Sequence, residues 1–244
     1  GMNFWRVVSD NMVSSTIRSF SVLNLSSLGA LVYHIHADAG LNLVSNKVAE
    51  WENQVSINFL ASQGISSSRP DLKQNVINGR NTVHFGGSNG SSQEYLSLPD
   101  FEINSTEFTI FISYKQESLN ASNSYLLAET APISGVISGG TTGGGRNFGI
   151  ISAQTTQVIR KPGTTHLKWA IRTGQHKYLF ENGLVEPLMV GDSVEGLQFN
   201  TIGLRPDVPS LNFHGDLAEI VIYNTSLSST NRQTVENYLL SKYT

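Results

Sequence analysis

Cysteine is absent from all 244 residues of this chain, which excludes disulfide bonds and thiolate metal sites. Charged residues are scarce at 14%, and the formal net charge is −3. The Lys and Arg residues are scattered, which argues against a nucleic-acid-binding surface because such surfaces need clustered basic groups. No apolar run approaches the roughly 20 residues that a membrane-spanning helix needs. A hydrophobic core must therefore hold the domain together, and a chain of this length can build one.

Carboxylates in the pattern expected for sugar hydrolysis are missing as well. Retaining glycosidases need two carboxylates about 5 Å apart, and no E-x-D-x-E pattern that would place them on one strand occurs. Asp216 and Glu219 are three residues apart, so on a regular strand their side chains face opposite sides. We therefore expect a protein without enzymatic activity.

What the chain does contain is a series of short apolar segments separated by turn residues. Phe108–Tyr114 is the clearest strand, with apolar and β-branched residues at alternate positions. Asn78–Gly79 predicts a tight turn, because both residues tolerate positive φ. Turn signals recur at a spacing of roughly 8–12 residues, which is typical of a β-sandwich or barrel.

The C-terminal stretch predicts a buried strand, a turn and a helix. Leu217–Tyr223 is almost wholly apolar and rich in β-branched residues, as in a strand covered on both faces. Ser228 fits a helix N-cap because its hydroxyl can accept a hydrogen bond from a free backbone N–H. One face of the following helix would pack on the sheet through residues at a spacing of three to four: Val235, Tyr238, Leu239 and Lys242.

These C-terminal residues carry a family resemblance. Gly215–Tyr223, Leu227–Ser228 and Tyr238–Tyr243 resemble the closing signature of concanavalin A-like domains, in the laminin-G-like group of bacterial and phage proteins. Ala37–Gly40 matches that group's "A-D-A-G" motif. The resemblance covers about residues 24–244. It implies an all-β fold, a two-sheet antiparallel jelly-roll sandwich with a short C-terminal helix, in which Glu219 is a buried structural carboxylate satisfied by backbone groups or an Arg.

The chain divides into residues 1–27, an N-terminal arm, and residues 28–244, the sandwich domain. Gly1 before Met2 has the form of a tag remnant, and the arm carries apolar side chains at Phe4, Trp5, Val7 and Val8. We expect the arm either to fold back on the domain or to dock on a protein partner or a second copy of the chain.

Candidate glycan contacts lie in a glycine-rich stretch and on exposed aromatic rings. We expect Gly135–Phe148 to form a loop in which Arg146 and Asn147 offer hydrogen-bond donors. Tyr125 and Tyr178 would be stacking platforms for sugar rings, the alternative being burial in the core.

Two metal sites are also considered. His34, His36 and Asp38 would face one side of a strand and could bind zinc; alternatively His34 packs where the resembling family has a Trp. Calcium is common in concanavalin A-like domains and is bound by oxygen ligands. The candidate calcium donors are Asp100, Asn104, Asp207 and Asn212.

Three functions follow from these features. The preferred one is a non-catalytic, lectin-like carbohydrate-binding module of a virion, a tail fibre or a cell-surface protein, acting outside the cell or on the virion. The alternative is a structural or adhesion protein that binds a protein partner through its N-terminal arm. A glycoside hydrolase is the least favoured, because the carboxylate pattern is missing.

Overall fold

A computed structural model describes residues 23–86, 93–103, 108–116, 123–129, 134–142, 145–152, 165–173, 176–181, 184–185, 197–205 and 212–243. Within these ranges, the side chains of residues 116, 123–124 and 134–197 lie outside the description. Among the described residues, no helix has the length and apolarity required to cross a membrane.

The described strands pair antiparallel along one continuous hydrogen-bonded path. Two of its links consist of a single residue pair, and one of them, Lys47 with Asp71 between β3 and β5, divides the path into two groups of strands. On one side of this point lie β5 (Asp71–Ile77), β6 (Arg80–Phe85), β16 (Gly215–Tyr223), β8 (Phe108–Gln116), β12 (Thr165–Thr173), β13 (His176–Glu181) and β14 (Leu184–Val185), with β1 (Leu31–His36) on β16. On the other side lie β3 (Lys47–Trp51), β4 (Ala61–Ser62), β7 (Leu96–Ile103), β15 (Leu197–Ile202), β9 (Asn123–Ala128), β10 (Ser134–Thr142) and β11 (Gly145–Ser152), with β2 (Leu41–Val44) on β3.

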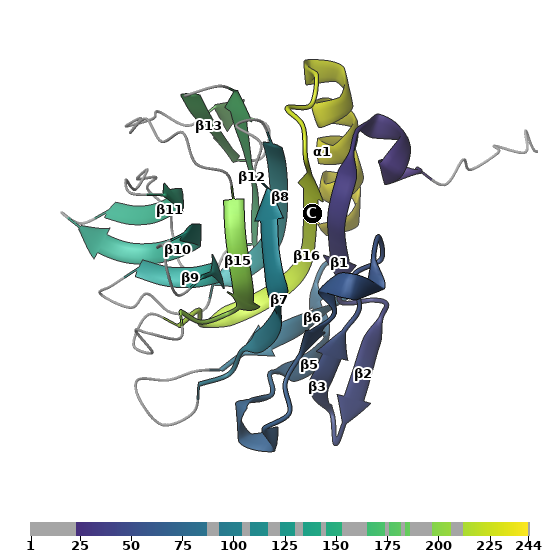
Figure 1. The fold of residues 1–244 in the computed structure, drawn as a ribbon, viewed down its shortest axis with the longest axis vertical. Helices are drawn as coiled ribbons and strands as arrows, with labels where there is room; N and C mark the ends of the chain where they lie inside the picture. The colour runs from purple at the N-terminus through teal and green to yellow at the C-terminus, as the bar shows by residue number, and fades with distance from the viewer. Residues whose placement is uncertain are drawn as a thin grey trace, which may run out of the picture.

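The two groups of strands face each other across one hydrophobic core (Figure 1). The ring of Tyr33 on β1 meets the rings of Phe101 on β7 and Phe199 on β15, with centroids 5.4 and 5.6 Å apart. Such edge-on aromatic contacts add to the stabilisation that comes from burying the rings. The predicted all-β sandwich with a C-terminal helix is confirmed.

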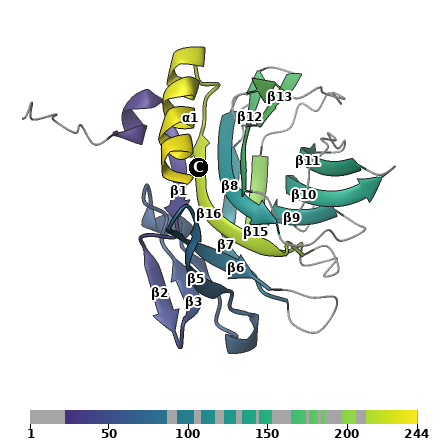
Figure 2. The same ribbon diagram turned by 180° about the vertical axis from the view of Figure 1, so that it is seen from behind.

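β16 is the central strand, and both of its faces are buried. Leu217, Ile220 and Ile222 point into the core between the layers. The other face carries Val221 and Tyr223, which pack against α1 (Ser229–Tyr243). Figure 2 shows α1 lying on the outside of β16. A run of apolar residues without polar alternation therefore marks a strand that is covered on both sides.

A β-bulge in β16 overturns the expectation that Asp216 and Glu219 face opposite sides. The register against β8 shifts between Leu217 and Glu219. Leu217 and Ile220 both face the core, so their neighbours Asp216 and Glu219 both face outward. One extra residue in a strand re-aims the side chains that follow it, and no local sequence signal announced it.

The C-terminal helix begins and packs as the sequence predicts. Ser228 Oγ accepts a hydrogen bond from the backbone N–H of Asn231 at 3.3 Å, so Ser228 caps the helix. Val235 and Leu239 are buried against the outer face of the sheet, while Leu227 joins the same cluster just before the cap.

The glycine-rich stretch is not the loop that its composition predicts. Residues 134–142 and 145–152 form the hairpin of β10 and β11, in which Gly135 pairs with Ile151 and Gly139 with Asn147. A strand ladder is made by backbone groups, which glycine also carries, so glycine weakens a strand without forbidding it.

Only the last residues of the expected arm are described. Leu25–Leu28 form a short 3-10 helix, η1, in which Leu25 is buried. The hydroxyl of Tyr223 donates to the carbonyl of Leu25 at 3.1 Å. This segment therefore packs on the domain, while residues 1–22 lie outside the described residues.

Candidate functional site

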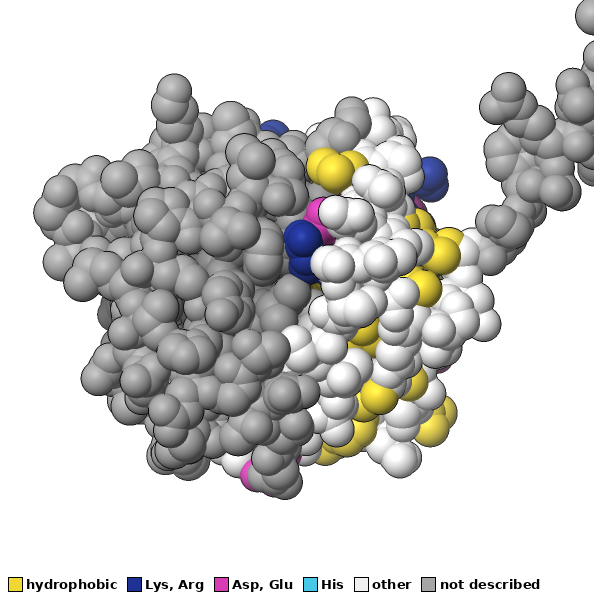
Figure 3. Space-filling view, turned by 90° about the horizontal axis from the view of Figure 1, so that it is seen from above, with side chains coloured by type: hydrophobic (Ala, Val, Ile, Leu, Met, Phe, Trp, Pro, Cys, Tyr) yellow, Lys and Arg dark blue, Asp and Glu magenta, His cyan; other side chains and the backbone are white. Residues whose placement is uncertain are grey.

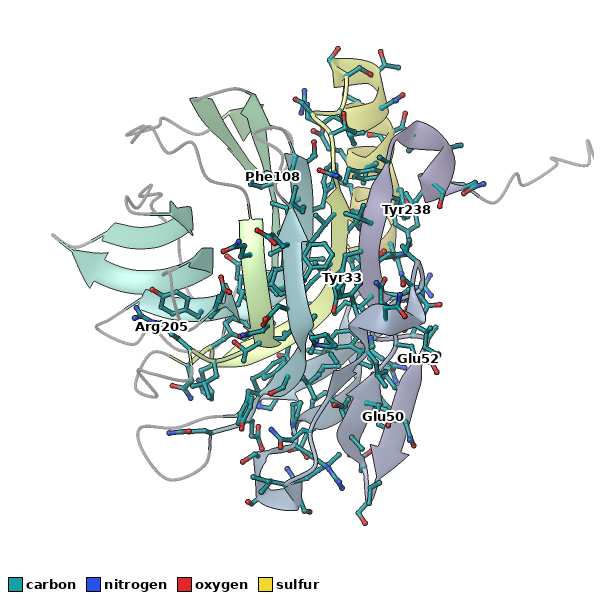
Figure 4. All side chains as sticks on the ribbon, viewed as in Figure 1. Tyr33, Glu50, Glu52, Phe108, Arg205 and Tyr238 are labelled. Carbon is teal, nitrogen blue, oxygen red and sulfur yellow. The ribbon has the colours of Figure 1, made fainter. Side chains whose placement is uncertain are left out.

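A pocket of about 550 Å³ opens beside α1, and we call it the α1 pocket. Its lining comes from η1 and the residues before it, from β1, from the turn after β3 and from Tyr238 on α1. The residues that line it are Leu23, Asn24, Leu25, Ser26, Leu31, His34, Gln54, Val55 and Tyr238. Figure 4 labels Tyr238, which projects from α1 toward the η1–β1 segment. A concave site with an apolar wall and a few polar groups is the usual form of a small-molecule site.

Backbone hydrogen bonds to β1 place the turn that carries Gln54. The N–H of His34 donates to Oδ1 of Asn53 at 2.9 Å, and the N–H of Gln54 donates to the carbonyl of His34 at 2.7 Å. On the opposite side, Asn24 caps η1 by accepting the N–H of Ser26 at 3.1 Å. Hydrogen bonds thus hold both sides of the pocket in place.

Behind the pocket lies a buried carboxylate with four donors, and we call Glu219, His34, Tyr238, Lys242 and Tyr243 the Glu219 cluster. Oε1 of Glu219 lies 2.7 Å from Nε2 of His34 and accepts the Tyr238 hydroxyl at 3.1 Å. Oε2 accepts the Lys242 ammonium at 2.8 Å and the Tyr243 hydroxyl at 2.6 Å. Glu219 is only 1% exposed, so these contacts replace its lost hydration.

The charge state of Glu219 follows from these contacts. Burial alone would raise its pKa, but the hydrogen bond from His34 and the positive charge of Lys242 outweigh burial and lower the pKa from 4.5 to about 2. Burial and the nearby Glu219 charge raise the pKa of Tyr238 and Tyr243 well above their ordinary value. Glu219 is therefore a carboxylate, and both tyrosines remain protonated donors, at neutral pH.

The Glu219 cluster confirms one part of a sequence expectation and corrects another. Glu219 is buried, as the resemblance implies, but its partners are a His, a Lys and two Tyr hydroxyls rather than backbone groups or an Arg. Three of these partners belong to the Tyr238–Tyr243 segment, so the strand and helix parts of the C-terminal signature meet in one cluster. Because His34 and Tyr238 also line the α1 pocket, the cluster fixes two of its walls.

The zinc hypothesis for His34, His36 and Asp38 does not fit the described residues. The two imidazole rings do lie side by side, with centroids 5.3 Å apart. However, His34 is bound to Glu219, and Asp38 accepts the backbone N–H of Asn81 at 3.2 Å. No group of three His, Asp or Glu residues in the described part of the chain is placed to hold a metal ion.

Of the four predicted glycan contacts, Tyr125 is the only one whose side chain is described. It is 3% exposed and accepts a hydrogen bond from Nη1 of Arg205 at 3.3 Å, so Tyr125 belongs to the packed interior and is not an exposed platform. Arg146 and Asn147 lie on β11 and Tyr178 on β13. Their side chains lie outside the described residues, so their contact with a glycan stays a prediction.

Two of the four candidate calcium donors are described. Asp100 lies on β7 and accepts the Asn200 amide at 3.0 Å, and Asn212 is buried beside Tyr125. Asn104 and Asp207 lie outside the described residues.

Asp100 also lies near two other carboxylates, Glu102 and Glu129, a grouping that the sequence did not predict. Burial raises the pKa of Glu129, and the negative charges of Asp100 and Glu102 raise it further. Glu102 accepts the Gln198 amide at 2.5 Å on the same sheet. Asp100 and Glu102 lie on β7 and Glu129 directly follows β9, and none of the three lines the α1 pocket.

The amino-acid sequence did not indicate that the residues of the α1 pocket would come together. Gln54 lies in a turn and Asn24 before a short helix, positions where polar residues are common. The one available signal was His34, a polar residue where the resembling family has a packing Trp.

Comparisons with known proteins show which fold class this chain has. No protein-family model matches the sequence, and no curated protein matches it. Domain 4 of AbnA, an extracellular GH43 arabinanase from Geobacillus stearothermophilus solved with arabinotriose, matches with a TM-score of 0.59 and 14% identity, over 85% of this chain and 98% of that one.

Two further structures agree in fold. The binding domain of Paraclostridial Mosquitocidal Protein 1 matches with a TM-score of 0.57 and 12% identity, over 88% of this chain and 53% of that one. Trypanosoma rangeli sialidase, in complex with the inhibitor DANA, matches at 0.53 and 12%, over 84% of this chain but only 32% of the sialidase. Identities this low show the fold alone: this chain is an antiparallel β-sandwich of the jelly-roll class, closed by a C-terminal helix.

Proposed function

We propose that this chain is a non-catalytic carbohydrate-binding module and that the α1 pocket is its glycan site. The observation that carries the proposal is the mixture of groups around one hollow. Amide, hydroxyl and imidazole side chains stand beside a tyrosine ring and leucine side chains. Sugars present the same mixture, because hydroxyl groups surround a ring with apolar C–H faces.

Each side of the pocket has a role in this proposal. The amides of Asn24 and Gln54 can both donate to and accept from sugar hydroxyls. The Tyr238 ring offers an apolar surface on which a sugar C–H face can pack. The Glu219 cluster holds His34 and Tyr238 before any ligand arrives, and a pre-organised wall avoids part of the entropy loss of binding.

The fold comparison supports the proposal without deciding it. The arabinanase domain, which matches this chain over most of both lengths, was solved with arabinotriose. One fold hosts many functions, so the main support for the proposal comes from the α1 pocket. That the module acts outside the cell, or as part of a virion tail or cell-surface protein, is part of the same proposal and rests on the Ser-, Asn- and Gly-rich composition.

The proposal makes the module non-catalytic because no described residue that lines the α1 pocket is a carboxylate. Asp216 is 1% exposed and is bonded by Thr82 and His84, and Glu219 is equally buried. Among the described residues, the acidic group around Glu129 is one place to test. Incubation with β-glucans and arabinans should release no reducing sugar, and hydrolysis that disappears in Glu129→Gln would overturn this part of the proposal.

A glycan array with matched variants tests the binding function. We expect the intact chain to bind one glycan class and Gln54→Ala to weaken that binding at least several-fold. Gln74→Ala is the matched control, because Gln74 is an exposed glutamine on β5 that does not line the α1 pocket. Binding that is lost equally in both variants, or a blank array with and without calcium, would contradict the proposal.

A protein-binding function is the second candidate, and exposed apolar side chains favour it. Ile57 is 81% exposed and Ile65 is 61% exposed, which is unusual for large aliphatic residues.

Deleting residues 2–22 while keeping Leu23 tests whether the N-terminal arm takes part in binding. A shortened chain with unchanged oligomeric mass and melting temperature would exclude docking of the arm on a second copy.

A further inference from the structure

The described lining of the α1 pocket contains no Asp, Glu, Lys or Arg among its nine residues. Its one basic group is the His34 imidazole, which is 13% exposed and whose Nε2 lies against Glu219. Figure 3 shows the upper face of the molecule, where white and yellow atoms predominate on the described part and a few Lys, Arg, Asp and Glu side chains are visible.

The charges directly behind the wall compensate one another. The Lys242 ammonium and the Glu219 carboxylate form a pair at 2.8 Å. Asp38 lies 3.8 Å from Arg80 and 3.9 Å from Lys242. Lys242, the cation closest to Tyr238 in this group, also lies over the Tyr238 and Tyr243 rings, at 5.5 and 5.1 Å from their centroids. Its charge is therefore already satisfied on the inner side of the wall.

The described lining also offers no Lys or Arg to an anion. An anionic ligand in the α1 pocket would therefore leave water without gaining a Lys or Arg partner among the described lining residues. Removing a charge from water without a partner is costly.

From this lining we infer that the α1 pocket selects neutral saccharides and rejects acidic ones, such as uronic acids and sialylated sugars. The inference rests on the proposed function, and it names the substrate class of the same site. Neutral sugar hydroxyls need only the amides, hydroxyls and imidazole that the wall supplies, whereas a sugar carboxylate gains its strongest hydrogen bonds from a Lys or Arg, which no described lining residue provides.

The test uses two oligosaccharide series of the same linkage and length, one of galactose and one of galacturonic acid, together with lactose and 3′-sialyllactose. Affinities are measured by calorimetry on the intact chain, with all ligands in the same buffer at neutral pH. We expect each acidic member to bind at least about tenfold more weakly than its neutral counterpart.

A charge variant makes the test specific to the pocket. Ser26 is exposed, lines the pocket and lies on η1, so Ser26→Lys adds a cation to the wall. This variant should improve binding of the acidic series relative to the neutral one. Ser27→Lys is the matched control, since it adds the same charge one residue away at a position that does not line the pocket.

The outcomes separate this inference from the function on which it rests. Neutral preference in the intact chain, reduced by Ser26→Lys and kept by Ser27→Lys, supports the inference. Equal or tighter binding of the acidic series that Gln54→Ala abolishes would overturn the inference and leave the glycan function standing. Absence of binding to both series and to the array would overturn both.

Discussion

Both faces of β16 bury apolar residues, but the outer face adds a cluster of directional hydrogen bonds. On the inner face, Leu217, Ile220 and Ile222 pack into an apolar core in which any side chain of similar volume finds contacts. On the outer face, the Glu219 carboxylate accepts hydrogen bonds from four donors on β1 and α1. Hydrophobic burial is non-directional, whereas hydrogen bonds require defined positions. The inner face thus stabilises the sandwich, and the outer face determines where the helix and the pocket wall lie.

Removing the Glu219 carboxylate should have the largest effect on stability. Glu219→Ala leaves a buried ammonium and two buried hydroxyls without their acceptor, so we expect a loss of about 3–5 kcal/mol of unfolding free energy, measured by urea denaturation. Glu219→Gln, which keeps the size of the side chain, serves as the comparison. A loss below 1 kcal/mol in Glu219→Ala would show that the outer face contributes little.

Acid should weaken the outer face selectively. The pKa of Glu219 is lowered in the folded state, from 4.5 to about 2. Its contribution is therefore fully present above about pH 4.5 and is lost as the pH falls toward 2, a change on the order of 3 kcal/mol. Denaturation midpoints at a series of pH values measure it. The acid loss should be smaller in Glu219→Gln, and an identical pH profile for both proteins would contradict the assignment.

Tyr238→Phe separates the role of the hydroxyl from that of the ring, because it keeps the ring and removes one hydrogen-bond donor. The hydroxyl bonds Glu219 at 3.1 Å, so its loss should cost about 1–1.5 kcal/mol. Glycan affinity should fall several-fold, since the ring is no longer tied to the cluster. Calorimetry on the folded variant measures the affinity, and unchanged affinity would separate the cluster from the pocket.

The smallest effect is expected on the inner face. Ile222→Val removes one buried methyl group from the core, and we expect a loss of about 1 kcal/mol. Glycan binding should stay at the level of the unchanged chain, because Ile222 points away from the α1 pocket. A clear loss of affinity in this variant would show that the two faces are coupled.

Periodicity was sufficient for the features that depend on local pattern. The strand at Phe108–Tyr114, the fully buried β16 and the capped helix after Ser228 were all predictable, because each rests on residues that are close in sequence. The same approach failed at the glycine-rich stretch, where composition suggested a loop and backbone pairing formed the β10–β11 hairpin.

The amino-acid sequence by itself determined the fold class, since apolar spacing decides which residues can be buried together. It did not determine that Asp216 and Glu219 share a face, because a bulge depends on how two strands pair. Nor did it show that Glu219 would meet His34, which is 185 positions away in the chain, or that Asn24, Gln54 and Tyr238 would line one pocket. Local patterns record what each segment prefers, but a binding site is assembled from segments that only the completed packing brings together.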